Sequence, residues 1–232
     1  MVRPLQEYRI ISIVACTFLL TSCILLLLVG LSLPIIKSIY IIKVQSTANI
    51  GPPTTVATQL RFGVWGVCAY SDLEQPTPLG ENGLCFGPML GYVVPPEITS
   101  LIGLSPDIIN AVEVSLRVIL VLHPVAAGLA LITFFTSLFL ASHAVSIFTL
   151  FLAVVAALLA TVVFGIDLAL VLIVKNALKN LLNLNLKFDV AFGGGVWMVL
   201  VGVILLWTSV CLLSARACYC CGISRKPVKQ VF

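Results

Sequence analysis

Two ionisable residues of this chain, His123 and Asp167, lie inside long apolar segments. An ionisable group inside a membrane is costly and marks a functional site by default. His123 follows Arg117 by six residues and Asp167 precedes Lys175 by eight, which predicts depths of about 9 and 12 Å below one membrane face. If their helices are neighbours, the two side chains can bond, and protonation of His123 would change the helix packing. The alternative is that Asp167 bonds a backbone group or Arg117 and fixes helix register without switching.

A second candidate site is the cysteine cluster of the C-terminal tail, directly beyond Arg216. A structural zinc site needs four ligands, and this tail has no histidine, so we expect neither a metal nor a cofactor. Cysteines next to basic residues at a membrane edge are typical of S-palmitoylation sites. The predicted acylation sites, with free thiols as the alternative, are Cys218, Cys220 and Cys221.

A third set, Cys68 and Cys85, is an isolated pair of cysteines between the first two apolar segments. Such a pair is typical of a disulfide in an oxidising compartment. The bond would close a loop of about 17 residues and stabilise the fold by roughly 3 kcal/mol. Two buried free thiols are the alternative interpretation.

The composition indicates where these residues reside. Of the 232 residues, 60% are hydrophobic and only 9% are charged, against about 25% charged in a soluble domain. The mean hydropathy is +1.17, so a soluble domain, a disordered chain and a nucleic-acid-binding protein are all excluded. The chain is predicted to be an integral membrane protein whose first partner is the lipid bilayer.

Four segments are long enough to cross a bilayer as helices, since about 20 apolar residues are needed. They are residues 10–36, 118–141, 144–174 and 190–215. Only residues 142–143 separate the second and third, which predicts an antiparallel hairpin of two packed helices. Small residues in the third and fourth segments allow close helix contact, either within the bundle or in a homo-oligomer. The fold class is therefore a membrane all-α, four-helix bundle.

The orientation of the four spans follows from basic residues and cysteines. Six basic residues lie on the side of the termini and seven on the other, which decides nothing. The tail 216–232, however, has four basic and no acidic residues, as expected of a segment facing anionic cytoplasmic lipid. The isolated cysteine pair favours an oxidising side for the long loop. We therefore expect residues 1–9, 142–143 and 216–232 in the cytoplasm, and residues 37–117 and 175–189 outside.

The long loop 37–117 is predicted to form a small ectodomain. Tyr40 to Val44 and Thr58 to Tyr70 have the alternation of strands, so a sheet of two to four strands is expected. Ser105-Pro106-Asp107 has the cap and first-turn proline of a helix that runs into the second span.

The ectodomain also contains the segment Gly63-Val64-Trp65-Gly66, which is separated from Cys68 by one residue. Glycines on both sides of a tryptophan allow a strand to pack close to the membrane surface, with the indole at the headgroup level. Gly63, Trp65 and Gly66 are therefore the predicted seat of the ectodomain. No catalytic motif accompanies it: the chain has two histidines, no Gly-x-Ser-x-Gly and no His-Glu-x-x-His, so we expect no enzyme.

These elements together resemble a known family. Beyond the Gly-x-Trp-Gly-x-Cys element, the segments that carry the resemblance are Leu33-Pro34-Ile35-Ile36-Lys37, Leu120-Val121-Leu122-His123-Pro124-Val125-Ala126-Ala127, Phe164-Gly165-Ile166-Asp167-Leu168 and Gly193-Gly194-Gly195-Val196-Trp197. In this order they are similar to the motifs of the fungal PalI-type family of four-span proteins, which includes pH-response regulators and cortical-patch, eisosome-associated members and looks distantly related to claudins.

The resemblance implies a fungal plasma-membrane protein that is claudin-like in architecture, with a disulfide-stapled extracellular sheet. It implies a non-enzymatic role in organising a membrane domain, or in sensing ambient pH or cell-wall state through partner membrane or signalling proteins. Two alternatives remain open at this point. One is a small channel or transport accessory subunit that uses Asp167 and His123, and the other is a claudin-type adhesion module.

Overall fold

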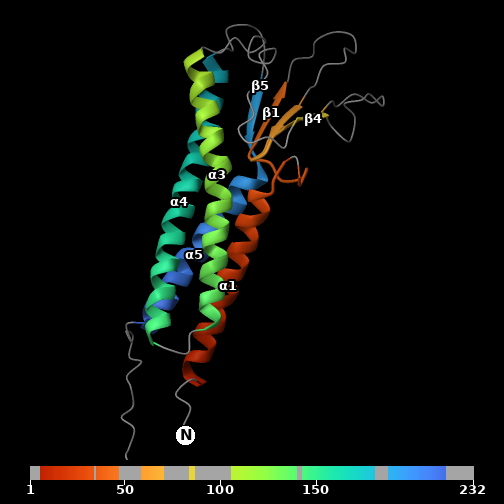
Figure 1. The fold of residues 1–232 in the computed structure, drawn as a ribbon. Helices are drawn as coiled ribbons and strands as arrows, with labels where there is room; N and C mark the ends of the chain where they lie inside the picture. Colours follow the sequence, from red (N-terminus) through yellow and green to blue (C-terminus); the bar gives the residue numbers. More distant parts are fainter. Residues whose placement is uncertain are drawn as a thin grey trace, which may run out of the picture.

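The computed structural model describes residues 6–33, 35–46, 59–70, 84–86, 106–139, 143–180 and 188–217. Within them lie four long helices: α1 (Gln6–Gly30), α3 (Pro106–Leu138), α4 (His143–Asn180) and α5 (Gly194–Ala217). All four are long and apolar enough to cross a membrane. Figure 1 shows them side by side in one bundle, with a small sheet at one end. We call that end of the bundle the sheet side.

The four helices form a ring in which each one packs against two neighbours. α1 contacts α3 and α5, and α4 contacts the same two helices from the opposite side. The interior contains leucine, valine and alanine side chains, and four alanines of α4 lie fully buried in it: Ala153, Ala156, Ala157 and Ala160. The small residues of the third span therefore serve packing within this bundle, which is the first of the two roles that the sequence left open.

Polar side chains add hydrogen bonds between the helices of the bundle. The Ser22 hydroxyl on α1 donates to the Gly202 carbonyl on α5 at 3.0 Å, where a glycine allows the two backbones to approach. The Trp207 indole on α5 donates to the Thr161 hydroxyl on α4 at 3.1 Å. These bonds fix the rotation of the helices about their axes as well as their spacing.

The sheet has five antiparallel strands in the order β4-β3-β2-β1-β5. The strands are β1 (Ile42–Ser46), β2 (Gln59–Phe62), β3 (Val67–Tyr70), β4 (Leu84–Phe86) and β5 (Phe188–Phe192). The expectation of two to four strands was too low, because the second loop contributes β5, which pairs with β1 along its whole length. The expected single strand over 58–70 is two strands, since Gly63 to Gly66 form the turn between β2 and β3.

One face of the sheet packs on the bundle. Ile42 of β1, Val67 of β3 and Val190 of β5 share a buried core with Leu170 and Val171 of α4. Because successive side chains of a strand alternate between faces, Lys43 and its neighbours on the adjacent strands lie on the opposite face. The sheet is therefore fixed against α4 on one side and presents a more polar face on the other.

The ends of two predicted spans differ in the structure. α1 ends at Gly30, and the described residues Leu31 to Leu33, Ile35 and Ile36 lie in turns and an isolated bridge, whereas the sequence predicted a helix to Ile36. α5 begins at Gly194, whereas the sequence predicted a helix from Val190. In both places the apolar run continues past the helix, and the hydrophobic residues of it that are buried, Leu33 and Val190, are buried in the protein.

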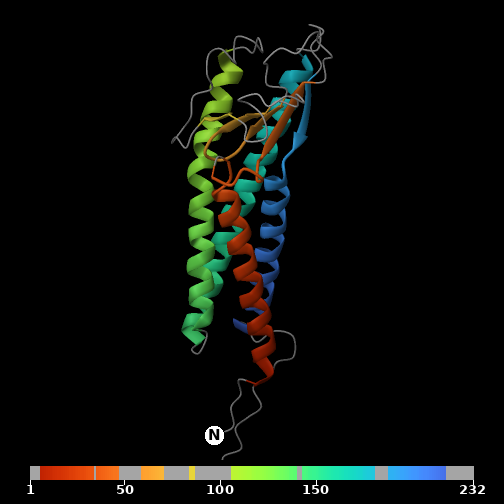
Figure 2. The same ribbon diagram turned by 90° about the vertical axis from the view of Figure 1, so that its right-hand side faces the viewer.

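α3 and α4 extend well beyond α1 on the sheet side, as Figures 1 and 2 show. α3 has 33 residues and α4 has 38, which gives lengths of about 50 and 57 Å at 1.5 Å per residue. The hydrocarbon core is only about 30 Å thick. The excess length stands beside the sheet and supports it. The start of α3 at Pro106 agrees with the predicted helix that runs into the second span.

Candidate functional site

The turn between β2 and β3 docks on the end of α1. The Gly63 amide donates to the Gly66 carbonyl at 2.9 Å and closes the turn. At the tip of the turn, the Val64 amide donates to the Ser32 hydroxyl at 2.9 Å, and the Trp65 amide donates to the Leu33 carbonyl at 3.0 Å. Two residues of this turn are thus joined to the segment that directly follows α1.

The Trp65 indole completes this docking, because its Nε1–H donates to the carbonyl of Gly30. Gly30 is the last residue of α1, and the last carbonyls of a helix have no partner within the helix. The indole therefore acts as a cap on α1. The sequence predicted Trp65 at the headgroup level of the membrane, and the structure places it half-buried against the end of a helix.

Gly63 is required at this turn by space rather than by backbone conformation. A Cβ at this position would lie 2.8 Å from the Leu33 amide nitrogen and 2.9 Å from the Leu33 Cα. Backbone atoms cannot move aside as the end of a side chain can. The sequence predicted that the glycines bring a strand close to the membrane surface, and in the structure Gly63 allows a close contact between the sheet and the segment after α1.

A second contact of the same kind joins the sheet to α5. The Gly193 amide donates to the Ile41 carbonyl at 2.8 Å, and the Gly195 amide donates to the Tyr40 carbonyl at 3.0 Å. A Cβ on Gly193 would lie 2.6 Å from the carbonyl carbon of Tyr40. The amides in the first turn of a helix have no carbonyl acceptor within that helix. The Tyr40 carbonyl supplies the acceptor for the Gly195 amide. We call this contact and the Trp65 turn together the junction.

His123 of α3 and Asp167 of α4 meet next to the junction. Their Nε2 and Oδ2 atoms lie 3.3 Å apart, and both side chains are 0% exposed. Each Cα–Cβ bond in a helix tilts toward the N-terminus of that helix. Because α3 and α4 are antiparallel, the side chains of His123 and Asp167 tilt in opposite directions along the hairpin, and this allows them to reach each other. The structure therefore brings together the two residues that the sequence singled out.

The pair lies closer to the sheet side than the sequence suggested. A Cβ on Gly30 would lie 3.9 Å from the Cβ and the backbone carbonyl carbon of His123, so His123 is level with the end of α1. The sequence estimate placed His123 and Asp167 about 9 and 12 Å below the membrane face by counting from Arg117 and Lys175. In the structure, α3 and α4 continue past the end of α1 on the sheet side, so these two basic residues do not mark the membrane face. Gly30 thus lies against His123 and also accepts the hydrogen bond from Trp65.

The surroundings of the pair are apolar and contain few other ionisable groups. Neither carboxylate oxygen of Asp167 has a well-directed hydrogen bond within the described residues. On α1 the nearest titratable side chain in the described chain is the thiol of Cys23, whose Sγ lies 4.0 Å from the carbonyl of Ala127, one turn below His123. The His123 and Asp167 side chains therefore contact each other in a buried, largely apolar interior.

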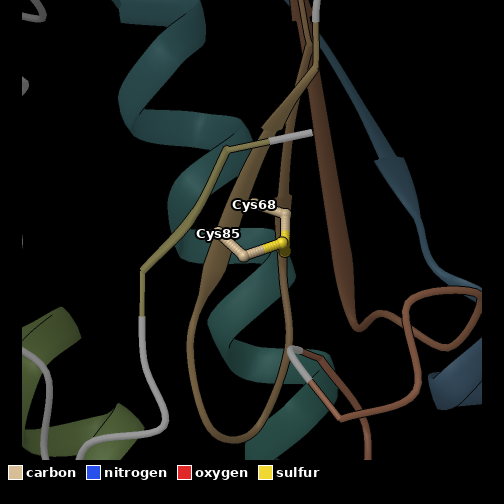
Figure 3. Close-up of a disulfide and its surroundings, with 2 residues drawn as sticks. All are labelled: Cys68 and Cys85. Atoms are coloured by element: carbon tan, nitrogen blue, oxygen red, sulfur yellow. A yellow bond between two sulfur atoms is a disulfide. The ribbon is translucent and has the colours of Figure 1, made fainter. Parts of the chain in front are cut away.

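The disulfide is confirmed. Cys68 of β3 and Cys85 of β4 are joined by an S–S bond, and they are directly opposite each other in the register of the two strands. Figure 3 shows the bond bridging neighbouring strands at the edge of the sheet. β4 has only three residues and pairs with β3 alone, so the disulfide holds the edge strand in place.

The predicted acylation sites Cys218, Cys220 and Cys221 lie outside the described residues. Within them, Cys16, Cys23 and Cys211 are free thiols. Groups of three or more metal-ligating side chains are not found in the described part of the chain. Sequence reasoning missed Gly30, Ser32 and Tyr40, which complete the junction through backbone or hydroxyl groups that leave no signal in a single sequence.

The fold defines the class of the protein. It is a multi-pass membrane protein with four spanning helices and a disulfide-stapled antiparallel sheet, which is a claudin-like four-span architecture. A family model, that of the SUR7/PalI family, matches residues 11–209, and the chain belongs to this family. Among curated proteins no sequence matches the chain. The matched range begins within α1 and ends within α5, so it contains the whole junction.

Proposed function

We propose that this protein is a non-enzymatic organiser of a plasma-membrane domain, with its sheet outside the cell and both termini in the cytoplasm. The observation that carries the proposal is the junction. Backbone hydrogen bonds join the sheet to the ends of α1 and α5, and a shared apolar core joins it to α4. A sheet that is fixed to three helices keeps one orientation relative to the bundle, so it can hold a bound partner in a defined position, as a scaffold must.

Family membership supports this proposal, because SUR7/PalI proteins are not a known enzyme family. The partners would be other membrane proteins that contact the lipid-facing sides of the helices or the polar face of the sheet. The basic tail with Cys218, Cys220 and Cys221 would add acyl chains and a preference for ordered lipid.

A second candidate function, ambient-pH sensing, is favoured by the His123–Asp167 pair. Histidine is the side chain whose ordinary pKa falls within the range of environmental pH changes. His123 lies against Gly30, whose carbonyl accepts a hydrogen bond from the Trp65 indole. A change of protonation in the pair would alter the packing of α1 against α3, and this change would reach the seat of the sheet through a single residue.

One experiment separates the two functions. The full chain carries a C-terminal tag, and its location is imaged in cells at acid and at alkaline external pH, with protease protection of the tag measured in parallel. Stable patches with a protected tag at both pH values support the organiser. Redistribution at one pH value that disappears in His123→Gln, but persists in the matched variant His143→Gln, supports sensing. Uniform distribution at both pH values contradicts the organiser, and an accessible tag contradicts the proposed orientation.

A further inference from the structure

Two basic residues lie directly opposite each other on the polar face of the sheet. The register of β1 and β2 pairs Lys43 with Arg61, and directly opposite residues of an antiparallel pair project to the same face. That face points away from α4, because the flanking residues Ile42 and Phe62 belong to the core on the other face. Lys43 and Arg61 are both half-buried, so part of each side chain reaches the surroundings.

This arrangement is unfavourable for the fold alone. Like charges directly opposite each other in a sheet are destabilising. Within the described residues, neither Lys43 nor Arg61 takes part in a salt bridge. The Nε–H of Arg61 is buried without a hydrogen-bond partner in the same part of the chain. Stability therefore does not explain why two cations stand together here.

Two tyrosine rings hold the Arg61 guanidinium in place. Its central carbon lies 5.1 Å from the centre of the Tyr40 ring and 4.4 Å from that of the Tyr70 ring. One terminal nitrogen donates to the Gln59 side chain at 3.2 Å. Rings that contact the guanidinium orient it and leave donors on its edge, and a planar fork of N–H groups matches the oxygens of a phosphate. Lys43 adds a second charge next to this fork.

The position of these residues relative to the bundle indicates the source of the phosphate. The Tyr40 carbonyl accepts a hydrogen bond from the first turn of α5, so Tyr40 is level with the sheet-side end of a spanning helix. Lys43 is about 10 Å further along the strand at 3.3 Å per residue. The headgroup layer extends about 5–7 Å beyond the hydrocarbon, and the long stem of a lysine reaches back toward it.

The attraction for an anion at this end is local. The loops on the sheet side, 37–117 and 175–189, carry seven basic and seven acidic residues in all, so they add no general positive field. The charge that would hold a phosphate is that of Lys43 and Arg61 themselves.

From this geometry we infer that Lys43 and Arg61, with the rings of Tyr40 and Tyr70, form a binding site for the phosphate of an anionic phospholipid in the leaflet on the sheet side. The lipid neutralises the opposed charges and so stabilises the sheet. The site is separate from the junction and does not depend on the proposed function.

The test measures thermal unfolding of the purified full-length protein in neutral detergent, titrated with phosphatidylglycerol, phosphatidylcholine or inorganic phosphate. Phosphatidylglycerol is expected to raise the Tm of the parent more than phosphatidylcholine does. Arg61→Gln is expected to weaken the apparent affinity for phosphatidylglycerol about tenfold or more, as loss of a charged hydrogen bond implies. Lys43→Gln removes the repulsion, so its Tm without lipid should equal or exceed that of the parent, and its gain with phosphatidylglycerol should be smaller.

The matched control is Arg117→Gln, which removes one exposed positive charge from the same side of the protein. It should keep the response of the parent to phosphatidylglycerol. An equal loss in Arg117→Gln would overturn the proposal, because general charge attraction would then explain the binding. Equal stabilisation by inorganic phosphate at the same concentration would also overturn it, because the ligand would be a free anion. If Arg61→Gln does not fold, Lys43→Gln decides alone, and a parental response in that variant refutes the site.

Discussion

The three consecutive glycines at the start of α5 give a sharp test of the junction. An added Cβ would lie 2.6 Å from the Tyr40 carbonyl carbon at Gly193 and 3.5 Å from the same carbon at Gly195, and it would meet nothing within 4 Å at Gly194. Substitution by alanine is the same chemical change at all three positions. The distance to Tyr40 decreases from Gly194 through Gly195 to Gly193, so the three variants form a graded series.

The magnitudes follow from this spacing. Replacing Gly194 by Ala should be neutral or stabilising by up to about 1 kcal/mol, since alanine is the better helix former and restricts the unfolded chain. Replacing Gly193 by Ala should destabilise by about 3 kcal/mol or more, at the upper end of overpacking costs. The carbonyls of Tyr40 and Ile41 are held by the amides of Gly195 and Gly193, so neither can move aside cheaply. Gly195→Ala should fall between the two.

The assay is thermal unfolding of the full-length protein in one detergent, followed by tryptophan fluorescence, with each variant compared with the parent. For a chain of this size, each kcal/mol shifts the Tm by about 2–4 °C. The expected order of Tm values, from highest to lowest, is Gly194→Ala, then Gly195→Ala, then Gly193→Ala. A Gly193→Ala protein as stable as the parent, or a Gly194→Ala protein that loses as much as Gly193→Ala, would refute the close contact between Tyr40 and the start of α5.

Three further predictions concern the other contacts. Replacing Cys68 and Cys85 together by Ser should cost about 3 kcal/mol, and reductant should lower the Tm of the parent to that of the variant; a parent unaffected by complete reduction would contradict this role of the bond. Trp65→Phe should lose about 1–3 kcal/mol because the Gly30 carbonyl loses its donor, whereas the control Trp197→Phe, at an exposed position, should not; equal losses would argue against the cap. Asp167→Leu should cost about 3–5 kcal/mol, while His123→Leu combined with Asp167→Leu should restore much of that loss; additive losses in the double variant would show that the pair is not coupled.

Sequence reasoning found the helices and their neighbours because the physics there is local. Segments of more than about 20 apolar residues must be spans, and the two-residue connection at Ser142 and His143 left no arrangement for α3 and α4 other than a hairpin. Neighbouring helices then implied that His123 and Asp167 could meet, and the structure places them 3.3 Å apart. Cys68 and Cys85 could be paired because no other cysteine lies between the first two spans.

The errors occur where tertiary contacts replace lipid. Val190 to Phe192 are apolar and continuous with the fourth span, so hydropathy alone assigns them to the helix. In the structure they pair with β1, and the strand ends where Gly193 meets the Tyr40 backbone. Leu31 to Ile36 were assigned to the first span for the same reason. Burial by a sheet and burial by lipid select the same residue types, so composition cannot distinguish them.

Gly30 lies where the sheet, α1 and α3 meet. Its carbonyl accepts the Trp65 indole of the sheet, and the residue lies against the turn of α3 that carries His123. A displacement of the sheet is therefore expected to change the end of α1, which packs against the fully buried His123. Coupling requires an element that both sites bias, and here that element is the last turn of α1. Coupling through the last turn of α1 predicts that the changes in Tm caused by Trp65→Phe and Asp167→Leu are not additive. The change in Tm of the double variant should differ from the sum of the two single changes.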